Sequence, residues 1–129
     1  MNAIYTATEY QAPLQKEILS IGYIKKINTV TVSGTTTDLE LFPDYNRLIQ
    51  QVEDHFSESG LLKCYFHFAA INTAITKVLF KLFRHLVNAQ KEGYQIKIFW
   101  IIEEGDHELI DVGLDFKNLY DLDFQITVK

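Results

Sequence analysis

The net charge of −5 on this chain of 129 residues argues against binding to nucleic acid or to an anionic membrane surface, because both partners favour a basic footprint. Hydrophobic residues at 47% and charged residues at 22% are typical of a globular domain with one core. No cationic segment followed by an apolar one opens the chain, and no apolar run approaches the ~18 residues of a membrane span. A single cytoplasmic domain over residues 1–129 is therefore expected.

The first half of the chain predicts a hairpin followed by a helix. Residues 1–14 are expected to be a loosely ordered lead-in. Residues 17–24 and 28–34 are short, β-branched and partly alternating segments, which is typical of a β-hairpin. Apolar residues then recur at helical spacing from Leu41 to Phe56, and Pro43 is tolerable because it falls in the first turn of that helix.

The second half alternates between strands and helices. Three strands and two helices are expected, at residues 61–68, 94–102 and 124–128 and at residues 75–87 and 107–119. Gly93 is well placed to end the first of these helices in a left-handed conformation. The segment 94–102 is almost wholly apolar, which indicates a strand covered on both faces. The pattern predicts one α/β domain with a mixed, mostly parallel sheet of about five strands and about three helices.

The same periodicities predict which side chains form the core. The residues expected to be buried are Phe66, Phe68, Leu79, Leu82, Phe83, Ile98 and Trp100. The only cysteine, Cys64, excludes an internal disulfide and is interpreted as a small core hydrophobe. Four scattered histidines form no H-x-x-x-H pair, and the glycines never cluster into a phosphate-binding loop. No catalytic residue, metal site or cofactor is predicted.

An acidic segment directly follows the apolar strand at 94–102 and includes Glu103, Glu104 and Asp106. Ligand sites in open α/β sheets lie outside the carboxyl ends of strands, and clustered carboxylates can hold magnesium. Acidic residues are also what the positive N-terminal end of a helix prefers. We therefore favour a solvated helix start, and keep a metal-assisted enzyme that uses these carboxylates as a less favoured alternative.

Three short polar side chains mark the start of the helix predicted at 75–87. Asn72 or Thr73 can accept hydrogen bonds from the unpaired N–H groups of the first turn, which is sufficient reason for their presence. The same turn also suits a phosphate, because phosphorylation adds nearly two negative charges at the positive end of the helix. Lys77 lies one turn further on and could pair with the phosphate. Thr76 is the second candidate, but its hydroxyl is expected to bond to the backbone.

From Tyr65 to Phe116 the sequence resembles the SiaC family of bacterial regulatory phosphoproteins. Members of the family carry Asn-Thr-Ser-Ser-x-Lys at a helix start after a strand, then a Gly, a strand with Trp, an acidic segment and Gly-x-x-Phe. The matching residues are Asn72, Thr73, Lys77, Gly93, Trp100, Glu103, Glu104, Asp106, Gly113 and Phe116. The resemblance implies a STAS-like layout, similar to anti-anti-sigma factors, and a role in partner switching.

The resemblance also implies a site and a set of partners. Thr73 would be the phosphorylated residue, modified by a kinase and restored by a metal-dependent serine/threonine phosphatase. The unmodified form would bind an effector such as a diguanylate cyclase. The residues implied at the partner-binding surface are Asn72, Thr73, Lys77, Glu103, Glu104 and Asp106.

Two hypotheses of different kinds compete with a phosphorylation switch. Ala74 and Ile75 stand where the family has two serines, which favours an interaction scaffold of the same fold that is never phosphorylated. The third hypothesis is the metal-assisted enzyme. Binding of magnesium or manganese would stabilise that enzyme against heat, so a thermal-shift assay separates it from the other two.

Overall fold

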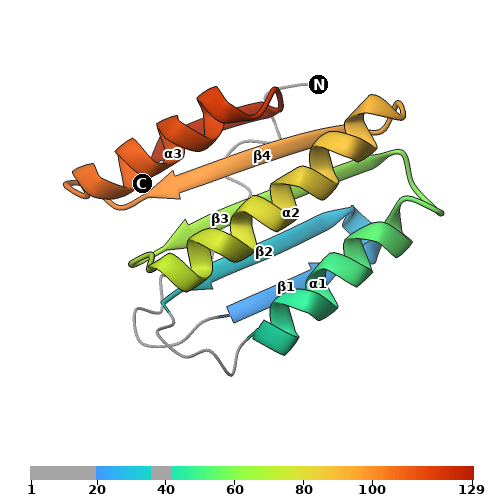
Figure 1. The fold of residues 1–129 in the computed structure, drawn as a ribbon, viewed down its shortest axis with the longest axis horizontal. Helices are drawn as coiled ribbons and strands as arrows, with labels where there is room; N and C mark the ends of the chain where they lie inside the picture. The colour runs from blue at the N-terminus through green and yellow to red at the C-terminus, as the bar shows by residue number, and fades with distance from the viewer. Residues whose placement is uncertain (1–19, 36–41) are drawn as a thin grey trace.

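The computed structural model describes residues 20–35 and 42–129, with side chains from Tyr45 onward in the second range. Within these residues, five strands form one sheet in the order β1-β2-β3-β4-β5. Their bounds are β1 Ser20–Ile24, β2 Thr29–Gly34, β3 Leu61–Phe68, β4 Gln95–Ile102 and β5 Asp123–Val128. β1 runs antiparallel to β2, and the other neighbouring strands are parallel (Figure 1).

In the part of the chain that the structure describes, three α-helices connect the strands: α1 Phe42–His55, α2 Thr73–Lys91 and α3 His107–Leu119. A short 3₁₀ turn, Lys25–Ile27, joins the hairpin strands β1 and β2. The predicted single α/β domain with a mixed five-stranded sheet and three helices is therefore confirmed. The predicted lead-in at 1–14, the first residues of the predicted strand at 17–24, and Leu41 all lie outside the described residues.

Local sequence signals explain where α2 begins and ends. The side chain of Asn72 accepts a hydrogen bond from the backbone N–H of Ile75 at 2.8 Å, so Asn72 is the N-cap. At the other end Gly93 has a φ of 102°, a left-handed conformation that glycine adopts without steric cost. Both signals were predicted from the sequence and are confirmed.

All three helices pack on the same face of the sheet (Figure 1). Their buried side chains form one cluster with the side chains of β2, β3, β4 and β5 that point to this face. The predicted core residues Phe66, Phe68, Leu79, Leu82, Phe83, Ile98 and Trp100 all belong to this cluster and are at most 2% exposed. Cys64 also lies in it, fully buried, and burial raises the pKa of its thiol.

The opposite face of the sheet also carries buried side chains. Tyr65, Phe99 and Ile101 form a second, smaller cluster, in which the rings of Tyr65 and Phe99 stack with centroids 4.7 Å apart. Both faces of β4 are thus buried from Ile98 onward, as its apolar sequence predicts. None of the helices in the described ranges is long and apolar enough to cross a membrane.

Candidate functional site

The candidate site lies at the edge of the sheet where β3 and β4 end. These strands are parallel neighbours, so their carboxyl ends meet at the same edge, and α2 and α3 begin there (Figure 1). This is the edge at which α/β folds usually present their functional groups. The sequence-predicted residues around Thr73 and around Glu103 therefore flank one edge of the molecule.

Thr73 is the first residue of α2, and its side chain is exposed. Asn72 precedes it with an extended backbone, at φ −111° and ψ 175°, and caps the helix with its side chain. Thr73 is thus presented to solvent by a fixed, capped backbone.

Thr76 lies in the same turn but is placed differently. Its hydroxyl donates to the backbone carbonyl of Asn72 at 3.0 Å, and its side chain is half-buried. The expectation that its hydroxyl is occupied by the backbone is confirmed. Lys77, one turn after Thr73, is exposed.

The first turn of α2 contains no acidic side chain. The helix N-terminus carries a partial positive charge, which Asp or Glu in the first turn usually balances. Among the described residues, the neutral side chain of Asn72 caps that end. The start of α2 therefore keeps a positive potential beside an exposed hydroxyl.

The acidic segment after β4 has distinct roles for its three carboxylates. The Asp106 side chain caps α3 by accepting from the backbone N–H of Leu109 at 3.2 Å. Glu104 is exposed, and Glu103 lies 2.7 Å from Nε2 of His67. The capping role agrees with the favoured interpretation of a helix start.

The pair of His67 and Glu103 was missed in the sequence. His67 is fully buried near the end of β3, whereas Glu103 is half-exposed just after β4. Burial lowers the pKa of His67, and the hydrogen bond and charge of Glu103 oppose that shift. The sequence did predict a mostly parallel sheet. Because parallel neighbours align their carboxyl ends, that prediction could have indicated that His67 and Glu103 lie close together.

The predicted residues at this edge fall into two separate groups. Among the described residues, no hydrogen bond or salt bridge joins Thr73 or Lys77 to Glu103, Glu104 or Asp106. Within the same part of the chain, no group of three His, Cys, Asp or Glu side chains is arranged to hold a metal ion. This edge therefore presents the exposed hydroxyl of Thr73 at the positive end of α2, and separately the carboxylates that follow β4.

Known proteins resemble this chain both in fold and in sequence profile. No curated protein matches the chain. A chain in the crystal structure of diguanylate cyclase SiaD in complex with its activator SiaC from Pseudomonas aeruginosa matches with a TM-score of 0.82 at 14% identity, over 92% of this chain and 98% of that chain. Apo-SiaC from the same organism matches with a TM-score of 0.72 at 13% identity, over 92% of this chain and 95% of that chain.

At such low identities the two structures establish a shared fold. The sequence profile of the SiaC family of regulatory phosphoproteins matches residues 15–129, which is most of the chain. This chain therefore belongs to the SiaC family of regulatory phosphoproteins.

Proposed function

We propose that this protein is a non-catalytic cytoplasmic regulator that binds a protein partner at the edge where α2 begins, and that phosphorylation of Thr73 switches this binding. The observation that carries the proposal is the position of Thr73: exposed, first in α2, and in a turn without an acidic side chain. Membership of a family of regulatory phosphoproteins supports it.

Thr73 is preferred to Thr76 on geometric grounds. A kinase needs a hydroxyl that is exposed and free to be extended into its active site. The hydroxyl of Thr76 is bonded to the backbone of Asn72, and its side chain is half-buried. Phosphorylation of Thr76 would break that bond, whereas phosphorylation of Thr73 would leave the cap of α2 intact.

A phosphate on Thr73 would change the surface without opposing the fold. It would add nearly two negative charges at the positive end of α2, where the helix dipole favours them. Lys77, on the same exposed face one turn later, could pair with it. An interface formed with the neutral hydroxyl would then have to bury an unmatched charge, which weakens binding.

The proposed partners are suggested by membership of the SiaC family. SiaC of Pseudomonas aeruginosa is the activator of the diguanylate cyclase SiaD. We propose that this chain likewise binds an effector such as a diguanylate cyclase, with a kinase and a metal-dependent serine/threonine phosphatase acting on Thr73. The proposed partner-binding surface consists of Asn72, Thr73, Lys77, Glu103, Glu104 and Asp106.

The test uses the protein that co-purifies with the tagged chain. Thr73→Glu should weaken binding of this protein, and Thr73→Ala should bind it constitutively. Ser57→Glu, which adds the same charge at an exposed site beyond α1, is the control and should bind as the wild type does. Thr73→Glu should also keep the wild-type melting temperature, because the helix dipole accepts the charge. Equal affinities for Thr73→Glu and Thr73→Ala would overturn the switch.

The second candidate is a scaffold that is never phosphorylated. Its support is the absence of the two family serines at positions 74 and 75. Ile75, however, is only 1% exposed and packs in the core, so a hydroxyl at this position would not be accessible to a kinase. Mass spectrometry of the chain isolated from its own cells separates the candidates, because a scaffold would carry no phosphate on Thr73.

A further inference from the structure

α2 differs in charge from the rest of the chain. The chain contains 17 acidic residues among 129, yet the 19 residues of α2 include no Asp or Glu. Its cations are Lys77, Lys81, Arg84 and Lys91, and all four are exposed. The last turn of a helix favours a cation, which accounts for Lys91. The other three cations, which we call the basic face, need another explanation.

Helical spacing places the basic face on one stripe with Thr73. Residues 73, 77, 81 and 84 follow one another at intervals of three or four, so their side chains lie one above the other. This stripe is opposite the buried residues of α2, such as Leu79 and Leu82. The basic face therefore runs along the outer surface of α2 and starts one turn after Thr73.

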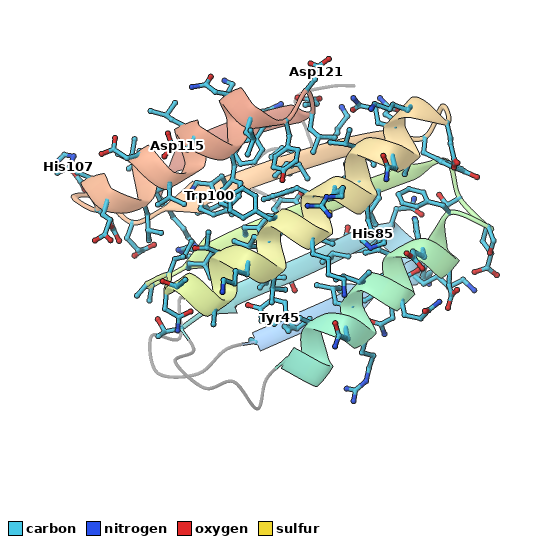
Figure 2. The ribbon with its side chains drawn as sticks, viewed as in Figure 1. Tyr45, His85, Trp100, His107, Asp115 and Asp121 are labelled. Carbon is cyan, nitrogen blue, oxygen red and sulfur yellow. The ribbon has the colours of Figure 1, made fainter. Side chains whose placement is uncertain are left out.

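Helix stability does not explain the basic face. Lys77 and Lys81 are four residues apart and repel each other, and a solvated helix usually alternates the signs of such pairs. Lys77, Lys81 and Arg84 form no salt bridge with any residue that the structure describes. By contrast, His85, which projects from α2 (Figure 2), is paired with Glu53 of α1 at 2.8 Å.

Two aromatic residues, Phe80 of α2 and Tyr120 after α3, border the basic face on the side of α3. Phe80 is 36% exposed, although its ring contacts that of Phe116 with centroids 5.3 Å apart. Tyr120 donates a hydrogen bond to the backbone carbonyl of Phe80 at 3.4 Å. Burial raises the pKa of Tyr120, and the charge of Arg84 opposes this shift, so Arg84 lies close to Tyr120. Apolar surface thus adjoins the basic face.

The neighbouring helix restricts what can bind there. α3 packs beside α2 and carries the exposed acidic side chains of Asp111 and Asp115, of which Asp115 is labelled in Figure 2. A broad anionic surface, such as a lipid bilayer, would approach these carboxylates together with the basic face and be repelled. A narrow acidic segment that lies along α2 would meet only the cations and the ring of Phe80.

We propose that the outer face of α2, from Thr73 to Arg84, docks an acidic amphipathic segment of a protein partner. The segment places carboxylates against Lys77, Lys81 and Arg84 and an apolar side chain against Phe80. This inference rests on the proposed function, since Thr73 lies at the head of the same stripe. A phosphate there brings negative charge to a surface that binds negative charge, and so repels the segment.

The probe is a fluorescein-labelled helical peptide with glutamates at positions i, i+4 and i+7 and a leucine at i+3. Its control is the same peptide with glutamines. In fluorescence anisotropy with the full chain, the glutamate peptide should bind about tenfold more tightly at low salt, and added salt should reduce this preference. Equal affinity for the two peptides would overturn the proposal.

Charge reversal then locates the binding surface. Lys81→Glu should weaken binding of the glutamate peptide about fivefold or more. Lys117→Glu, the matched reversal of an exposed lysine on α3, should change it less than about twofold. Circular dichroism should show that both variants fold. Equal losses in the two variants, or Lys81-dependent binding to phosphatidylglycerol vesicles without binding to the peptide, would overturn the assignment.

Thr73→Glu separates the two proposals. If it weakens peptide binding together with Lys81→Glu, the docking face and its regulation by charge are both supported. If Lys81→Glu weakens peptide binding, and Thr73→Glu weakens binding of neither the peptide nor the co-purified partner, the docking face stands and the switch is wrong. If Thr73→Glu weakens binding of the co-purified partner while Lys81→Glu behaves as Lys117→Glu does, the switch stands and the docking face is wrong.

Discussion

The indole ring of Trp100 lies directly against the backbone of Gly113. A Cβ atom at position 113 would come within 2.5 Å of Cδ1 and 2.6 Å of Nε1 of that ring. The same Nε1 donates a hydrogen bond to the backbone carbonyl of Leu109 at 3.0 Å. This contact holds α3 close to β4 (Figure 2) and so positions the start of α3, where Asp106 is the cap.

Replacing Gly113 by alanine should destabilise the protein. In the interior of a helix this change normally stabilises by about 1 kcal/mol, because glycine is a poor helix former. Here the new methyl group would push against a buried ring, so we expect a loss of about 1–3 kcal/mol in the free energy of unfolding. Urea denaturation measures it. Gly60→Ala, where no atom lies within 4 Å of the added group, is the control and should change little.

Replacing Leu82 by alanine should cost roughly 2–5 kcal/mol in the free energy of unfolding, because it opens a cavity in the core. Leu82 is 1% exposed and faces the sheet from α2. The neighbouring change Lys81→Ala, on the exposed face, should stay within about 0.5 kcal/mol of the wild type. Similar losses in the two variants would show that α2 is rotated from the orientation described.

Replacing Asn72 by alanine should cost about 1 kcal/mol in the free energy of unfolding, because the N–H of Ile75 loses its acceptor. Chemical denaturation of the variant is the measurement. Asn88→Ala, an exposed position in the same helix, is the matched control and should be neutral or slightly stabilising. If both asparagines behave alike, the cap contributes nothing to stability.

Stability should decrease as the pH falls below 6.5, the ordinary pKa of histidine, because burial of His67 lowers its pKa in the folded protein. The unfolded chain then binds the proton more readily than the folded one, so acid favours unfolding. His67→Gln should make the free energy of unfolding less sensitive to pH in this range. His107→Gln, at the exposed start of α3, should retain the wild-type slope. Identical slopes in all three proteins would contradict the assignment.

Local sequence determined the elements and part of the candidate site. β3 and α3 begin and end at the predicted residues, 61–68 and 107–119. A hydrophobic period of two or of about three and a half residues needs only neighbouring positions to be recognised. The exposure of Thr73 follows in the same way from its place after Asn72, because a cap and a first turn are defined by adjacent residues.

Only the tertiary structure decided which distant residues meet. His67 and Glu103 are 36 positions apart, and Trp100 reaches Gly113 and Leu109 from another element. These contacts depend on the register of parallel strands and on the rotation of each helix over the sheet. Packing of the whole core sets both, and no short segment encodes them. For the same reason the sequence showed that α2 lacks acidic residues, but only the fold left its basic face without salt bridges among the described residues.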